Sequence, residues 1–252
     1  MMKLLVPLVL VLAGASAIAQ NSPSVWPMPS PFPVVPQGAN SAAYPAPRME
    51  WFEHVADYNA KARKTADSIN LIFDGDSITD AWQGTGREVW AEHYAKLGAF
   101  DFGIGGDRTQ HVLWRLAQGQ AVGTHPKLIA LMIGTNNLGA NTNSQIADGV
   151  KEIIASYQKR CPDAVILLQG IFPREEKPTH PWRARIKAIN EMISKFEDGK
   201  KVIYLDFSDK FLNPDGTLSP EIMPDFLHPS AKGYQIWANA IQPVIDKYFP
   251  KK

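Results

Sequence analysis

Ser77, Asp225 and His228 are side chains of this sequence whose types could together carry out nucleophilic catalysis. A serine hydroxyl becomes a nucleophile when a neutral imidazole accepts its proton, and a carboxylate can hold that imidazole in the required tautomer. Asp225 precedes His228 by three residues, and Ser77 follows a short apolar run that ends before Gly75. Taken alone, Ser77 would more often be the N-cap of a helix, and Asp225 and His228 would more often be caps or solvated side chains. The predicted strands and helices around these residues decide between a catalytic role and a capping role.

The apolar segments of the chain predict strands that alternate with helices. Strands are expected at residues 71–73, 99–102, 127–133, 164–169 and 202–205. Helices are expected at residues 51–66, 87–96, 109–118, 144–159, 182–196 and 230–248. This alternation indicates βαβ units with right-handed crossovers and a parallel sheet. We therefore expect an α/β fold, a three-layer α/β/α sandwich of the flavodoxin-like kind with a five-stranded parallel sheet.

Four polar segments lie in loops that follow predicted strands. They are Gly75-Asp76-Ser77, Gly105-Gly106-Asp107, Gly134-Thr135-Asn136 and Asp225-Phe226-Leu227-His228. In open α/β sheets, ligands bind just beyond the carboxyl ends of the strands. We expect the four segments to meet there, with Asp76 and Asp107 accepting backbone hydrogen bonds in their turns and Asp80 capping the following helix.

In this order, the four segments resemble the sequence blocks of the GDSL-type or SGNH hydrolase superfamily, over about residues 68–248. One branch is more similar, namely the catalytic alpha subunits of intracellular platelet-activating-factor acetylhydrolase. The run at residues 102–116 (Phe-Gly-Ile-Gly-Gly-Asp-Arg-Thr-Gln-His-Val-Leu-Trp-Arg-Leu) looks like that branch. The wider superfamily usually has Asp after the asparagine of the third block, whereas this branch shares the Asn137 found here.

The resemblance implies an ester hydrolase that works through a Ser-Asp-His triad. Ser77 would be the nucleophile, His228 its base, and Asp225 the carboxylate that orients the base. The implied oxyanion donors are the backbone N–H groups of Ser77 and Gly106 and the side-chain amide of Asn136. Glycine at position 106 would let the backbone approach the substrate closely. The same resemblance leaves a homodimer open as the oligomeric state.

Other kinds of site are excluded by spacing. The glycine-rich run after the second strand has Arg108 where a dinucleotide fingerprint needs its third glycine. The turn at Ser77 lacks the second glycine of Gly-x-Ser-x-Gly, and no Gly-x4-Gly-Lys phosphate loop is present. The six histidines include no pair at metal-ligand spacing, and the single cysteine, Cys161, supports neither zinc nor an intramolecular disulfide. We therefore expect no cofactor and no metal.

The length and net charge of the chain limit the number of domains and the kinds of partner to expect. The 252 residues, 45% of them hydrophobic, suffice for one α/β domain of about 200 residues with extra sequence. The formal net charge of +1 gives no electrostatic reason to expect a nucleic acid or an anionic membrane as partner.

The N-terminal residues have a different composition. Lys3, an apolar run at residues 4–12 and the small-x-small sequence Ala17-Ile18-Ala19 are typical of a secretory signal peptide. The apolar run is too short to span a bilayer, so we expect no stable membrane insertion. We predict a signal peptide at residues 1–19, a Pro-rich solvated spacer at 20–47, and the hydrolase domain at 48–252. The protein would be secreted or periplasmic.

Residues beside the predicted triad bear on the substrate. Ile78, Phe226 and Leu227 are bulky and leave room for a short acyl group, so an acetyl ester of a small molecule, a lipid or a polysaccharide is expected. The loops at residues 82–86 and 174–182 should contact the alcohol part. The alternative is a non-catalytic carbohydrate-binding relative with the same fold, for which a complete triad has no use.

Overall fold

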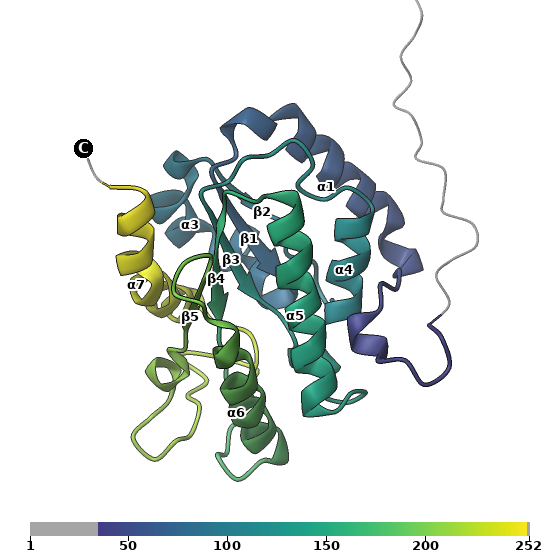
Figure 1. Cartoon of the computed structure of the whole chain (residues 1–252). Coiled ribbons are helices and arrows are strands. Elements are labelled where there is room, and N and C mark those ends of the chain that lie inside the picture. Colours follow the sequence, from purple (N-terminus) through teal and green to yellow (C-terminus); the bar gives the residue numbers. More distant parts are fainter. Residues whose placement is uncertain (1–34, 251–252) are drawn as a thin grey trace, which may run out of the picture. The chain divides into compact units, whose positions relative to one another are not determined.

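A five-stranded parallel sheet organises the computed structural model, which describes residues 35–250 (Figure 1). The strand order is β2-β1-β3-β4-β5, and every neighbouring pair is parallel. The strands are β1 (Leu71–Gly75), β2 (Ala99–Asp101), β3 (Leu128–Met132), β4 (Val165–Gln169) and β5 (Val202–Leu205). All residues of β1, β3 and β4 are buried, as expected for strands covered on both faces. The predicted fold class is confirmed.

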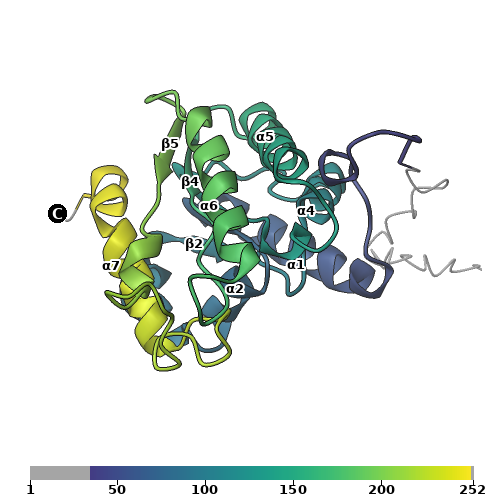
Figure 2. The same ribbon diagram turned by 90° about the horizontal axis from the view of Figure 1, so that it is seen from below.

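Helices cover the two faces of this sheet. The α-helices are α1 (Phe52–Lys64), α2 (Ser77–Asp80), α3 (Arg87–His93), α4 (Thr109–Ala117), α5 (Asn143–Arg160), α6 (Pro181–Ile193) and α7 (Ala231–Tyr248). Short 3-10 helices lie at Ser41–Ala43, Met49–Trp51, Ala66–Ser68, Ala81–Gln83, Ala95–Leu97, Thr135–Asn137, Ser194–Phe196 and Ser208–Phe211. Figure 2 shows α7 on the opposite side of the sheet from α4 and α5. No helix within residues 35–250 is long and apolar enough to cross a membrane.

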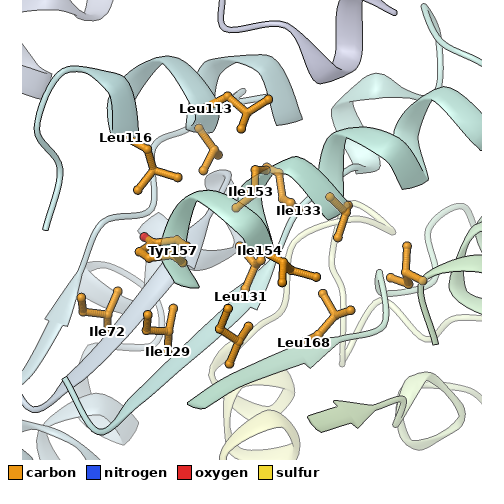
Figure 3. Packing of buried hydrophobic residues seen from close by; sticks show 14 of the residues in the cluster. Ile72, Leu113, Leu116, Ile129, Leu131, Ile133, Ile153, Ile154, Tyr157 and Leu168 are labelled. Atoms are coloured by element: carbon orange, nitrogen blue, oxygen red, sulfur yellow. The ribbon is translucent and has the colours of Figure 1, made fainter. Parts of the chain in front are cut away.

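Side chains alternate between the two faces along each strand. Ile72, Ile129 and Leu131 point toward α4 and α5, where they pack against Leu116 and Ile153 (Figure 3). Because each fully buried aliphatic side chain contributes about 1.5–3 kcal/mol, this layer is a large share of the driving force for folding. It also fixes α4 and α5 against the sheet.

The other face carries a cluster of aromatic side chains. Phe73 of β1 contacts Trp82, whose ring lies 4.5 Å from that of Tyr234 and 4.9 Å from that of Trp237. All four side chains are fully buried. Trp82 therefore belongs to the core, so a contact between the loop at residues 82–86 and the alcohol part would have to come from the residues after Trp82. The Trp82 ring contacts both the sheet, through Phe73, and α7, through Tyr234 and Trp237.

Part of the predicted spacer is packed rather than solvated. Ala42 is buried, and its carbonyl oxygen accepts a hydrogen bond of 2.7 Å from the Thr109 hydroxyl. Gly149 of α5 makes this possible, because a Cβ there would lie 2.5 Å from the same carbonyl oxygen. Residues 40–46 thus pack along α4 and α5, whereas the sequence predicted a solvated spacer. The predicted signal peptide, residues 1–19, lies outside the described residues.

Candidate active site

The turn after β1 presents Ser77 at the start of α2. Asp76 is the N-cap of this helix, with extended backbone angles and a side-chain oxygen that accepts from the Ile78 N–H at 3.0 Å. Gly75 has no room for a side chain, since a Cβ would lie 2.2 Å from Thr79 Oγ1 and 2.4 Å from the Met132 oxygen. The interpretation of Ser77 as a mere N-cap is therefore wrong, because its neighbour fills that role.

Ser77, His228 and Asp225 form a continuous chain of hydrogen bonds. Ser77 Oγ lies 2.9 Å from His228 Nε2, and His228 Nδ1 lies 2.6 Å from Asp225 Oδ2. The other carboxylate oxygen of Asp225 accepts from the backbone N–H of His228 at 2.7 Å and from that of Leu227 at 3.1 Å. Partial burial acts to raise the pKa of Asp225, but the hydrogen bonds from His228 and the backbone outweigh it and leave that pKa below its usual range. The carboxylate is thus charged and holds one imidazole edge.

The three donors expected for the oxyanion site come from separate loops. The backbone N–H groups of Ser77 and Gly106 have no hydrogen-bond partner among residues 35–250. Asn136 Nδ2 donates to the Asp107 carbonyl oxygen at 2.9 Å, which leaves its second amide hydrogen unused. Gly106 has a φ of +78°, a conformation that glycine adopts without cost. The fold therefore leaves donors from three separate loops unpaired.

Arg115 of α4 ties the serine turn to the Gly106 loop. Its Nη2 donates to Asp74 Oδ1 at 2.9 Å, and its Nε donates to Asp107 Oδ2 at 2.8 Å. Burial raises the pKa of Asp107, and the charge of Arg115 opposes that rise. The expectation that Asp107 accepts backbone hydrogen bonds is wrong, because its carboxylate is bound by arginine side chains.

Arg48 contacts the same loop from the N-terminal side. Its Nη1 donates to the Gly105 carbonyl oxygen at 2.6 Å and lies 3.3 Å from Asp107 Oδ1. The guanidinium also covers Gly106, where a Cβ would lie 3.0 Å from Nη1. Two arginines from distant parts of the chain thus hold this loop.

Two further residues have roles that the sequence did not indicate. Asp80 precedes the 3-10 helix Ala81–Gln83, but its side chain makes no capping hydrogen bond there; its Oδ2 accepts from the Gly105 N–H at 3.1 Å. Asn137 is buried, and it accepts from the Thr109 N–H while its amide donates to Gln110 and Asn141, each at 3.0 Å. An aspartate could not donate these two bonds, which accounts for Asn137 where the wider superfamily has Asp.

The hydrogen-bond network beneath the site was not predicted from the sequence. Asp74 Oδ2 accepts from the Tyr157 hydroxyl at 2.5 Å and from Gln120 Nε2 at 2.7 Å, and all three side chains are buried. The available signal was Arg115, a charged residue within the apolar pattern of its helix. Within the described part of the chain, no three His, Cys, Asp or Glu side chains gather as a metal site would require.

Known proteins match the chain in sequence and in fold. The model of the GDSL-like Lipase/Acylhydrolase family matches residues 73–236. Platelet-activating factor acetylhydrolase IB subunit alpha1 of Rattus norvegicus is 34% identical over 203 residues, which cover 79% of this chain and 86% of that protein. A solved GDSL-like lipase from Bacteroides thetaiotaomicron has a TM-score of 0.62 at 21% identity, covering 77% of this chain and 97% of its own. The acetyl xylan esterase AlAXEase has a TM-score of 0.57 at 20% identity, covering 70% and 100%. At such identities the two structures share the fold.

Proposed function

Because the chain belongs to the GDSL-like lipase/acylhydrolase family of carboxylic ester hydrolases, we propose that it cleaves short-chain esters, acetyl esters first, through Ser77, His228 and Asp225. The observation that carries this proposal is the hydrogen-bonded chain from Asp225 to His228 to Ser77, with steps of 2.6 and 2.9 Å. Such a chain is the arrangement that activates a serine hydroxyl in an ester hydrolase.

In the first half of the reaction, Ser77 Oγ attacks the ester carbonyl carbon while His228 Nε2 takes the hydroxyl proton. The imidazole becomes positively charged, and the Asp225 carboxylate on Nδ1 stabilises that charge. The carbonyl oxygen gains a negative charge and accepts hydrogen bonds from the unpaired N–H groups of Ser77 and Gly106 and from the second amide hydrogen of Asn136. Each such donor contributes about 2.7–4 kcal/mol of transition-state stabilisation.

The second half returns the enzyme to its starting state. His228 gives its proton to the leaving alcohol oxygen, the C–O bond of the ester breaks, and an acyl group remains on Ser77. Water then loses a proton to His228 and attacks the acyl carbon. The tetrahedral intermediate collapses to a carboxylic acid and free Ser77, with the proton returned from His228 to Oγ.

An acetyl group suits the surroundings of Ser77 and the relatives of the chain. Ile78 is buried beside Ser77, and Phe226 and Leu227 pack against the same apolar cluster. The names of two similar proteins, a platelet-activating factor acetylhydrolase subunit and an acetyl xylan esterase, both refer to acetyl esters. We propose an acetyl ester of a small molecule or a polysaccharide.

The proposed site of action is outside the cytoplasm, in the periplasm or the medium. This rests on the sequence of residues 1–19, with cleavage after Ala19. Mass spectrometry of the protein isolated from those fractions should give a chain that begins at Gln20. An intact N-terminal Met in the cell interior would contradict export.

The catalytic proposal is tested by replacing Ser77 with alanine. Against 4-nitrophenyl acetate, Ser77→Ala should lower kcat by about 10⁴-fold or more, because the nucleophile is lost. Ser144→Ala, which changes an exposed serine of α5, is the matched control and should retain activity. Unchanged hydrolysis by Ser77→Ala would disprove the proposed mechanism. Faster turnover of the octanoate than of the acetate ester would disprove the short-acyl preference.

A further inference from the structure

Arg174 lies beside the loop that carries Asn136. Its guanidinium carbon stands 4.4 Å from the centre of the Trp182 ring, a cation–π contact that restrains the charged group. Nη1 lies 3.4 Å from Thr135 Oγ1, and Thr135 directly precedes Asn136. The Arg174 side chain is 16% exposed, so it is held in place while part of it still reaches solvent.

The residue after Arg174 is joined to the loop that carries His228. The Glu175 N–H donates to the Phe226 carbonyl oxygen at 2.8 Å. Both residues have positive φ angles, 67° and 56°, which are unfavourable for side chains with a Cβ. Strain of this kind is concentrated at functional sites. Arg174 is therefore positioned between the loop of Asn136 on one side and the loop of His228 on the other.

The charge of Arg174 also reaches the serine turn. Burial raises the pKa of Asp76 to about 7, and the positive charge of Arg174 is among the influences that act against that rise. Asp76 directly precedes Ser77. This effect agrees with the placement of Arg174 near the reacting atoms.

Arg174 differs from nearby arginines in how few of its donors are used. Arg183 donates to the carbonyl oxygens of Glu175 and Gly216, and Arg48 donates to that of Gly105. In Arg174, the long contact with Thr135 is the one hydrogen bond within residues 35–250, and Nε has no hydrogen-bond partner. Glu175 Oε1 lies 3.5 Å from that Nε, and its side chain is 34% exposed. A partly buried guanidinium with unused donors is suited to binding a planar anion.

We propose that Arg174 binds an anionic group, a carboxylate or a phosphate, on the alcohol part of the ester. The inference rests on the proposed function, because it assumes an ester substrate. The acetyl group carries no charge, so the anionic group must belong to the alcohol part. Trp182 and Thr135 hold the guanidinium so that its free N–H groups face the alcohol. The enzyme would thus prefer acetyl esters of acidic sugars or of phosphate-bearing alcohols over neutral ones.

An anionic ester and its neutral methyl ester, compared in the wild type and in a variant, test this proposal. The kcat/KM values for 3-acetoxybenzoate and its neutral methyl ester are compared in the wild type and in Arg174→Met. We expect the wild type to prefer the anionic ester. In Arg174→Met the ratio of anionic to neutral kcat/KM should fall about 10- to 100-fold, because a hydrogen bond to a charged group is lost. Arg174→Lys, which keeps the charge, should recover part of the ratio.

Two control variants separate direct binding from a general field. Lys177→Met removes an exposed positive charge from the same loop and should leave the ratio unchanged. Glu175→Gln removes the carboxylate that competes for Arg174 and should raise the ratio. If Lys177→Met lowers the ratio as much as Arg174→Met does, a diffuse field explains the preference and the proposal is wrong.

Acetyl esters of natural alcohols show whether the anionic group is a carboxylate or a phosphate. Acetate release is measured from acetylated methyl glucuronoside against methyl glucoside, and from acetylated glycerol 3-phosphate against glycerol. Preference for the first member of either pair, lost in Arg174→Met, supports that source. An equal loss on anionic and neutral esters would show that Arg174 only positions its loop.

The result remains decisive if Arg174→Met does not fold, because a wild type without preference for any anionic ester overturns the proposal. Failure of the proposed function has a different signature, since the neutral ester would then be untouched by the wild type or cleaved equally by Ser77→Ala. In that case the Arg174 proposal fails with it.

Discussion

Replacing Arg115 with methionine should destabilise the fold strongly and in a pH-dependent way. Arg115 is 2% exposed and pairs with Asp74 at 0% and Asp107 at 2% exposure. Methionine fills similar apolar volume but leaves two buried carboxylates without their shared cation. Breaking one partner of a buried ion pair costs about 3–5 kcal/mol. Asp107 keeps Arg48 at 3.3 Å, and Asp74 keeps two neutral donors, so we expect about 3 kcal/mol.

The pH dependence of this loss follows from Asp107. Burial already raises its pKa, and Arg115 is the largest opposing influence. Without that cation, the folded-state pKa of Asp107 rises further above the unfolded value. A carboxyl with a raised folded pKa favours the native state at low pH, and this contribution is lost as the pH rises through the folded pKa. The deficit of Arg115→Met should therefore be larger at pH 8 than at pH 5.

Urea unfolding followed by tryptophan fluorescence at both pH values measures this effect. Arg87→Met, which removes an exposed arginine from α3, is the control and should change the free energy of unfolding by no more than about 0.5 kcal/mol. A loss below about 1 kcal/mol at pH 8, or an equal loss at both pH values, would refute the assigned role of the Arg115 pairs.

The remaining predictions concern single residues of the same turns. Asn136→Ala should lower kcat about 10²- to 10³-fold with little change in KM, and a raised KM at unchanged kcat in steady-state assays would contradict its oxyanion role. Gly106→Ala forces a Cβ to within 3.0 Å of Arg48 at a φ of +78°, so kcat should fall about 10²-fold by displacement of the N–H; wild-type kinetics would show that this position tolerates a side chain. Burial raises the pKa of Asp76 to about 7, so its contribution to stability is lost as the pH rises toward 7. Asp76→Asn, which keeps the acceptor for the Ile78 N–H, should gain stability over the wild type by about 1.4 kcal/mol per pH unit between pH 5 and 7 in urea unfolding, and a constant difference would disprove this.

The features that the sequence predicted are those encoded within short stretches. The apolar run that becomes β3 (Leu128–Met132) has no other interpretation than a buried strand or helix segment, and its length and flanks favour the strand. Ser77 and His228 were found because each belongs to a recognisable sequence block, and the loops at the carboxyl ends of parallel strands lie close together. Their hydrogen bond, across 151 positions of sequence, follows from that arrangement.

The features that the sequence did not predict depend on partners far along the chain. Nothing around Ala42 shows that Gly149, in the middle of α5, leaves space for its carbonyl group. Arg48 looked like the first residue of a domain, and its contact with Gly105 requires the fold to be known. Trp82 follows a turn and resembles a rim residue, yet the ring of Tyr234 covers it.

The exposure of His228 and Asp225 has a consequence for the robustness of the site. Ser77 begins α2 just after the buried strand β1, whereas the side chains of His228 and Asp225 are 39% and 55% exposed. A loop with few buried contacts opens at a far lower free energy than the core of the same molecule. We therefore expect His228 to lose its hydrogen bond to Ser77 at a lower free energy than the strands need to separate. The free energy needed to break the triad is therefore that of opening one loop. The free energy of global unfolding is only the upper bound of this value.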